Sequence, residues 1–185
     1  MIQRARMMFL VAAALAATTL PAHAQNATFG LTDVEAMLST VFQSERSSFS
    51  GIGLRGHLTT PLLMDGFSVT PAIEYWRNSN KLDSFGIKTT QSDATLGVEL
   101  RYTFAREGFQ PYLGAGWGVH FLASKVTAPT LGLDESDTVT RGGLAVLGGL
   151  SMPITARLAN VLELKFHYLP RDSQTKLNYG LSWKF

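Results

Sequence analysis

The 185-residue chain contains no cysteine. Beyond its N-terminal segment, no apolar run approaches the length of a transmembrane helix, about 18 residues. Without cysteine, the fold is stabilised without the disulfides on which many small secreted domains depend. Without a long apolar run, we expect no helical membrane span in the mature chain. Any membrane-spanning part therefore consists of β-strands, whose backbone groups are all paired once the sheet closes.

The first 24 residues have the features of a cleaved secretory signal peptide. They contain two arginines, an apolar run from Met7 to Ala17, and the small residues Ala22 and Ala24 before the expected cleavage site. The run is shorter than the about 20 residues of a spanning helix, so cleavage is favoured over a retained anchor. We therefore expect one mature domain, residues 25–185. Losing two arginines reduces the 16 basic residues to 14, equal to the 14 acidic residues, so the charge indicates no nucleic-acid partner.

From residue 49 to the end, apolar and polar residues alternate with the period of a β-strand. The clearest example is the last segment, Lys176 to Phe185, where every second residue is apolar and the residues between are polar or glycine. Six more segments alternate in this way: Phe49 to Pro61, Phe67 to Arg77, Asp93 to Ala105, Gln110 to Lys125, Gly142 to Met152 and Leu158 to Pro170. The pattern therefore predicts seven strands.

An eighth strand is needed if these strands close into a bacterial outer-membrane barrel, because single-chain barrels of that kind have an even strand count. The candidate is Val34 to Gln43, where the alternation is weaker than elsewhere. This segment also fits an amphipathic helix, since its apolar residues have helical spacing and Thr32 to Glu35 resembles a capping box. The even count favours the strand. The predicted fold is all-β, an eight-stranded antiparallel up-and-down transmembrane β-barrel.

The expected connections alternate between two classes. Tight turns follow the second, fourth and sixth strands, whereas two longer polar connections, about Asn78 to Gln91 and about Ser124 to Asp137, follow the third and fifth. This alternation is typical of barrels with short periplasmic turns and longer extracellular loops.

Glycine and aromatic residues indicate which strand face points outward. The polar faces are rich in glycine: Gly51, Gly53, Gly97, Gly114, Gly116, Gly118, Gly143, Gly149 and Gly180. Small residues suit the interior of an eight-stranded barrel, which is only wide enough for side chains. Aromatic residues on the apolar faces lie near strand ends, as in membrane interfaces: Phe67, Phe104 and Phe185 at one end, and Tyr75, Phe121 and Tyr168 at the other. The alternative is a soluble periplasmic barrel with an aromatic core, which leaves the glycines on its solvent face without a role.

Two segments resemble a known family. The segment Asn178 to Phe185 resembles the C-terminal strand that the barrel-assembly machinery of Gram-negative bacteria recognises, and the residues of this assembly signal are Asn178, Gly180, Trp183 and Phe185. Pro111 to Gly118 resembles the glycine-alternating strand of OmpA/OmpX-like small outer-membrane barrels. The resemblance implies the bacterial outer membrane as location, contact with its lipid and lipopolysaccharide, insertion by the assembly machinery, and a monomer. The cell-wall tethering of longer relatives is not expected.

The charged residues on the polar faces are expected to fill the lumen. They are Arg55, Glu74, Glu99, Arg101, Glu163, Lys165 and Lys184, together with the histidines His57 and His120. Charges in a narrow interior are costly unless paired, so the favoured role is a network of salt bridges and hydrogen bonds. The alternative is a narrow or gated pore lined by the same groups.

The sequence offers little support for an enzyme. Lipid A deacylases of the outer membrane need a histidine and a serine on one strand face. Here His57 is followed two residues later by Thr59, and His167 by Leu169. No metal-ligand spacing and no cofactor motif are present. We therefore expect a non-enzymatic barrel with a structural, adhesion or envelope-integrity role, with a small-solute pore second and a lipid A-modifying enzyme third.

Overall fold

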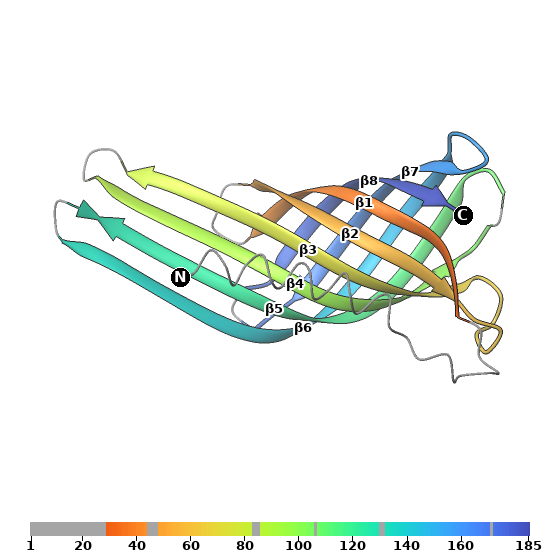
Figure 1. Cartoon of the computed structure of the whole chain (residues 1–185), viewed down its shortest axis with the longest axis horizontal. Helices are drawn as coiled ribbons and strands as arrows, with labels where there is room; N and C mark the ends of the chain where they lie inside the picture. Colours follow the sequence, from red (N-terminus) through yellow and green to blue (C-terminus); the bar gives the residue numbers. More distant parts are fainter. Residues whose placement is uncertain (1–28, 44–47, 83–85, 106, 130–131, 171) are drawn as a thin grey trace.

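The computed structural model describes residues 29–43, 48–82, 86–105, 107–129, 132–170 and 172–185, so the expected signal peptide, residues 1–24, lies outside the described residues. Eight strands follow one another: β1 (Gly30–Gln43), β2 (Phe49–Thr59), β3 (Phe67–Leu82), β4 (Ile87–Thr103), β5 (Gln110–Ala128), β6 (Leu133–Pro153), β7 (Leu158–Tyr168) and β8 (Gln174–Lys184). Each strand pairs antiparallel with the next, and β8 pairs with β1, which closes the barrel (Figure 1). The predicted fold class is thus confirmed.

The segment Val34 to Gln43 is part of strand β1, so the strand interpretation is confirmed and the helical one is wrong. It pairs with β2 on one side and with β8 on the other. Its alternation is weak because the inward residues Met37 and Val41 are themselves apolar and buried. Among the described residues, no helix is long and apolar enough to cross a membrane.

Strands β3 to β6 are longer than the other four. They contain 16, 17, 19 and 21 residues, whereas β1 contains 14 and β2, β7 and β8 contain 11 each. About 9–11 residues of a tilted strand span the bilayer, so the additional residues of β3 to β6 extend roughly 10–25 Å beyond the membrane-spanning part of the barrel. Figure 1 shows this extension, here called the outer sheet, beyond the ends of the other strands.

The outer sheet replaces the two long loops expected from the sequence. The segments Asn78 to Gln91 and Ser124 to Asp137 continue as paired strands as far as Leu82 opposite Ile87 and Ala128 opposite Leu133. Strand β4 also pairs with β5 up to Lys88 opposite Thr127, so the outer sheet has four strands. These segments lack apolar alternation because both of their faces lie outside the bilayer. Hydrophobic patterning therefore carried no signal there.

The outward face of the barrel is an apolar band with aromatic residues towards its ends. Leu54, Val98 and Leu164 are examples of this band, each at least half exposed. At the periplasmic end, Phe67, Tyr102 and Phe104 stack with ring centroids 4.8 and 5.0 Å apart. This surface matches the lipid-facing belt and aromatic girdles of outer-membrane barrels. The opposite faces point into the lumen, where the buried polar side chains lie.

Candidate functional site

The lumen contains an ionic network in which four carboxylates meet four cations. Its members come from six strands and are Glu35, Arg55, Glu74, Glu99, Arg101, Glu163, Lys165 and Lys176. Each of these residues is at most 3 % exposed. Because unpaired buried charges are strongly destabilising, the equal numbers of opposite charges allow the barrel to enclose them.

Glu163 has the most hydrogen-bond donors around it. Arg55 donates to both of its carboxylate oxygens, at 2.7 and 2.8 Å, and Arg101 donates to Oε2 at 2.8 Å. The Tyr112 hydroxyl donates to Oε2 at 3.0 Å, and the Asn178 amide donates to Oε1 at 2.8 Å. Five charged or polar donors thus converge on one carboxylate, which connects strands β2, β4, β5 and β8 to β7.

A missing side chain on β6 makes the Tyr112 contact possible. Gly149 pairs with Tyr112 on one side and with Glu163 on the other. A Cβ atom at Gly149 would lie 2.4 Å from the Tyr112 hydroxyl oxygen. The glycine therefore lets the tyrosine cross over β6 to reach the carboxylate. This is the physical role of at least one of the lumen glycines.

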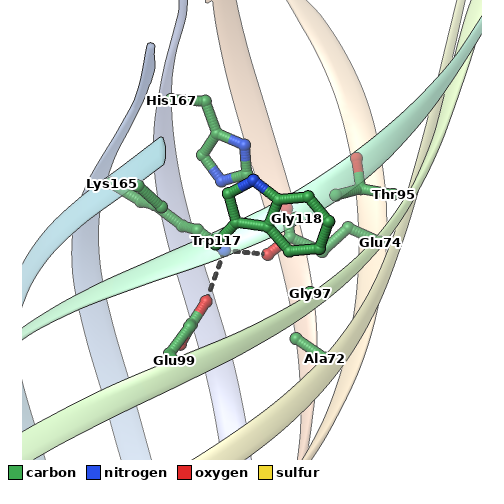
Figure 2. Close-up of a pocket in the computed structure, with 10 residues that line it drawn as sticks. Ala72, Glu74, Thr95, Gly97, Glu99, Trp117, Gly118, Lys165 and His167 are labelled. Atoms are coloured by element: carbon green, nitrogen blue, oxygen red, sulfur yellow. Dashed lines mark hydrogen bonds and ion pairs between the residues drawn. The ribbon is translucent and has the colours of Figure 1, made fainter. Parts of the chain in front are cut away.

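Glu74 and Glu99 hold the two lumen lysines. The Lys165 ammonium lies 2.5 Å from a carboxylate oxygen of each, as Figure 2 shows, and Lys176 donates to the other oxygen of Glu74 at 2.6 Å. Lys165 and Lys176 are cross-strand neighbours. Two like charges side by side are repulsive, so Glu74 lies where it neutralises both.

A second hydrogen-bonded chain lies on the outer side of the ionic network. The His120 Nδ1 atom is 2.8 Å from Asp93 Oδ2, and its Nε2 atom is 3.0 Å from His167 Nδ1. Gln174 donates to the same Asp93 oxygen at 3.2 Å and accepts from the Trp76 indole at 3.1 Å. Beside this chain, Trp76 packs with Val41 and Phe49 into an apolar cluster. The side chains of both sets are buried.

The space left inside the lumen is small. A cavity of about 10 Å³ lies between Glu74, Glu99, Lys165 and His167, and Figure 2 shows the side chains that line it. That is the room for about one water molecule. The Nε2 atom of His167 is buried without a protein partner, so a water molecule here would supply its hydrogen bond. Bulk water and hydrated ions do not fit in this cavity.

His57 has the partners of a catalytic histidine but not the access. Its Nε2 atom is 3.1 Å from Glu35 Oε2, and its Nδ1 atom is 3.2 Å from the hydroxyl of Thr70, which lies on the neighbouring strand. A carboxylate, an imidazole and a hydroxyl in sequence resemble a nucleophile relay. However, Thr70 is 0 % exposed, so no substrate reaches this hydroxyl in the structure. His120 uses one nitrogen for both Asp93 and Thr95, which is not a relay geometry.

Of the nine predicted lumen residues, eight make contacts inside the lumen and one lies at its periplasmic end. Eight lie inside and are hydrogen-bonded or ion-paired to one another or to other lumen residues: Arg55, His57, Glu74, Glu99, Arg101, His120, Glu163 and Lys165. The ninth, Lys184, is half-buried opposite Asp33 at the periplasmic end and forms no ion pair with any residue the structure describes. It shares a face with the network but lies beyond its end.

Lumen residues outside the nine predicted ones also take part in these contacts, among them Glu35, Asp93, Tyr112, His167 and Lys176. Glu35 and Lys176 could have been found from strand parity, since they alternate with outward residues of β1 and β8. Parity also places Tyr112 on the inward face, but its contact with Glu163 could not be predicted, because that contact depends on Gly149 of the strand between them. No group of three or more potential metal ligands occurs among the described residues.

The four residues of the expected assembly signal divide between the two faces of β8. Asn178 points inward to Glu163, and Gly180 lies against β1, where a Cβ would meet the Ala36 carbonyl oxygen at 3.0 Å. Trp183 and Phe185 point outward and are 49 % and 75 % exposed. The Phe185 amide donates to the Thr32 carbonyl of β1 at 3.0 Å, so the C-terminal residue is tied to the closing seam.

The outer sheet has two faces of opposite charge. Its outward face, which continues the lipid-facing side, carries Arg77, Lys81, Lys88, Lys125 and Asp134. Lys81 and Lys88 lie directly opposite each other. Lys125 pairs with Asp134 at 2.9 Å, and its hydrogen bond to that carboxylate lowers the pKa of Asp134. The outward face thus has a net positive charge just above the bilayer.

Comparison with known proteins identifies the family. The model of the outer membrane protein beta-barrel domain matches residues 10–185. The chain belongs to this family. No curated protein sequence matches the chain. Membership in this family, together with the barrel geometry, assigns the protein to the outer membrane.

Solved outer-membrane barrels share the fold of this family member. Neisserial surface protein A has 20 % identity and a TM-score of 0.59, covering 86 % of this chain and 99 % of its own. Ail of Yersinia pestis, solved with the heparin analogue sucrose octasulfate, has 13 % identity and a TM-score of 0.60, covering 84 % and 97 %. A major outer membrane protein of Thermus thermophilus has 10 % identity and a TM-score of 0.61, covering 84 % and 100 %.

Proposed function

We propose that this protein is a non-conducting barrel with a structural, adhesion or envelope-integrity role, in which the sealed lumen anchors a rigid outer sheet. The observation that carries the proposal is the ionic network. Its buried carboxylates and cations connect strands on opposite walls of the barrel, as in the contact of Lys165 on β7 with Glu74 on β3. A barrel braced in this way holds the outer sheet at a fixed position above the bilayer.

The packing of the lumen supports a plug over a pore. A pore lined by the same charges needs water along its axis, whereas these side chains are at most 3 % exposed and bonded to one another. Beside the hydrogen-bonded chain of His120 and His167, Trp76, Val41 and Phe49 form a buried apolar cluster. Apolar constrictions block ions by excluding water. The small-solute pore is thus the less supported function.

The outward face of the outer sheet supports contact with lipopolysaccharide. Arg77 lies two residues beyond the outer aromatic Tyr75 on the same face, and Lys81 lies four residues further out. These positions match the depth of phosphorylated headgroups, which bind Lys and Arg through charge-assisted hydrogen bonds. The same face would suit a sulfated or phosphorylated surface partner; the structure of Ail with sucrose octasulfate shows a barrel of this fold with a sulfated ligand.

The route to the membrane is part of the proposal. A signal peptide over residues 1–24 exports the chain, and the barrel-assembly machinery recognises the C-terminal strand. The exposed aromatic residues Trp183 and Phe185 support that recognition, because they remain available on the outer surface of β8. A monomer suffices for this role, since the barrel closes on itself.

Planar-bilayer recordings test the plug. Purified wild-type protein is expected to give no stable channels, and so are Glu99→Gln and Arg101→Gln, whose neighbours still fill the lumen. Heat-modifiable migration of the same samples on SDS gels verifies that the barrel is folded. Stable wild-type channels whose selectivity changes in either variant would contradict the non-conducting barrel and support the small-solute pore.

Lipopolysaccharide retention tests the outward face. The triple variant Lys81→Gln, Lys88→Gln, Lys125→Gln is expected to co-purify with less lipopolysaccharide and to lose it at lower salt than wild type, because exposed charge contacts are screened. The matched control is Lys184→Gln, which removes one cation at the periplasmic end. Equal retention by wild type and the triple variant would exclude this face as the contact.

A further inference from the structure

The inner face of the outer sheet contains a cavity that the plug and the lipopolysaccharide contact do not use. It has a volume of about 140 Å³ and lies at the outer mouth of the barrel, between the outer sheet, the end of β1 and the β7–β8 turn. Trp76, Leu122 and Val139 contribute apolar lining, and Gln43, Gln91, Ser92 and Ser124 contribute polar lining. We call it the mouth cavity.

The charges of the mouth cavity are unequal. Arg141 is its one cation among the described lining residues, and it is bound to the Asp172 carboxylate and, at 2.7 Å, to the Pro170 carbonyl oxygen. The second carboxylate of the lining, Asp137, forms no ion pair with another described residue. Glu135 follows two residues away on the same strand face. The mouth cavity therefore has a net negative charge, opposite to the outward face of the same sheet.

We propose that the mouth cavity binds a small organic cation, an ammonium or guanidinium group on a short alkyl stem. The Asp137 carboxylate meets the charge, the hydroxyl of Ser124, which lies directly opposite Asp137, accepts a further hydrogen bond, and Leu122 and Val139 pack against the stem. Anions are disfavoured, because Arg141 is already neutralised by Asp172.

The size of the cavity limits what can enter. Pockets for drug-sized ligands measure about 300–1,000 Å³, so this one accepts a single short chain. Two sources share the required chemistry: a free alkylamine, and the end of a lysine or arginine side chain presented by a peptide. The experiment distinguishes them by using one probe of each kind.

The test follows the Trp76 indole N–H resonance by NMR, in protein refolded without lipopolysaccharide in a zwitterionic detergent. Trp76 suits this purpose because Trp117 and Trp183 lie on the outward face of the barrel, away from the cavity lining. The probes are 1,5-diaminopentane, a capped Gly-Lys-Gly peptide, and 1-pentanol as the uncharged control. We expect saturable shifts with at least one amine probe and none with 1-pentanol.

Two variants on the same strand locate the contact. Asp137→Asn removes the cavity carboxylate and is expected to weaken amine binding by about five-fold, the size of a partly exposed ion pair. Asp134→Asn, on the outward face three residues earlier, is expected to bind as wild type does. A shift with the diamine alone assigns the site to free amines, and a shift with the peptide alone assigns it to a partner side chain. No shift with either amine, equal shifts with 1-pentanol, or unchanged binding by Asp137→Asn would overturn the proposal.

Discussion

Replacing Glu163 by glutamine tests whether the ionic network is dry and stabilising. The change keeps the shape of the side chain but removes one of the four negative charges. It also replaces one of the two carboxylate oxygens by an amide NH₂. Each of these oxygens accepts at least two hydrogen bonds: Oε1 from Arg55 and Asn178, and Oε2 from Arg55, Arg101 and Tyr112. Either orientation of the amide therefore brings donors against donors.

The expected loss of unfolding free energy for Glu163→Gln is about 3–5 kcal/mol, the usual cost of leaving a buried charge without its partner. The measurement is reversible urea unfolding in phospholipid vesicles, followed by tryptophan fluorescence. The matched control is Asp134→Asn, which breaks an exposed ion pair and is expected to change the unfolding free energy little, because solvent screens such pairs. The double variant Glu163→Gln, Arg101→Gln restores charge balance and should cost less than the sum of the single changes, by about 0.5–3 kcal/mol.

A Glu163→Gln cost close to that of Asp134→Asn would refute this reasoning. It would mean that the Glu163 carboxylate is hydrated in the folded barrel, so that water penetrates the network. The same result would weaken the case for a plug, because a hydrated network can conduct. The stability measurement and the bilayer recordings thus test the same feature by independent means.

Two further predictions concern single contacts. Gly149→Ala is expected to destabilise the barrel by about 1–3 kcal/mol through overpacking against Tyr112, whereas Gly30→Ala, whose added Cβ would have its nearest atom at 3.8 Å, is expected to be nearly neutral in the same urea assay. The Asp134 carboxyl should titrate below its usual pKa by NMR, and Lys125→Gln should raise that pKa. Because the Lys125 contact stabilises only the ionised form of Asp134, its contribution to stability is present at neutral pH and lost as the pH falls through the pKa of the folded state. An Asp134 titration unaffected by Lys125→Gln would show that the pair does not form in solution.

The spanning part of the fold was predictable because the bilayer imposes a regular pattern on it. One face of each strand meets lipid, so segments such as Lys176 to Phe185 alternate visibly and their strand identity follows from the sequence. The outer sheet was not predictable by this pattern, because water and headgroups surround both of its faces. Val34 to Gln43 was intermediate, since two apolar side chains also point into the lumen.

The sequence predicted which residues lie in the lumen but not which of them contact one another. Parity alone assigns residues such as Glu99 to the interior, and it applies equally to Lys184 and Lys176. Only the stagger of the strands around the barrel decides that Lys176 reaches Glu74, whereas Lys184 ends at the periplasmic rim. The Thr70 contact of His57 was missed for the same reason, because the two residues lie on different strands.

The β1–β8 seam has a consequence for the order of folding. Every other pairing joins neighbours in sequence, whereas Gln43 pairs with Gln174 at the far end of the chain. Long-range closure carries the largest loss of chain entropy, so hairpins form readily and the seam closes late. Two side chains of the closing strand β8 bond to the network. Lys176 reaches Glu74 on β3 across the interior, and Asn178 reaches Glu163 on the neighbouring strand β7. The ionic network is therefore completed only when the ring closes, which makes closure of the barrel and neutralisation of its interior a single cooperative event.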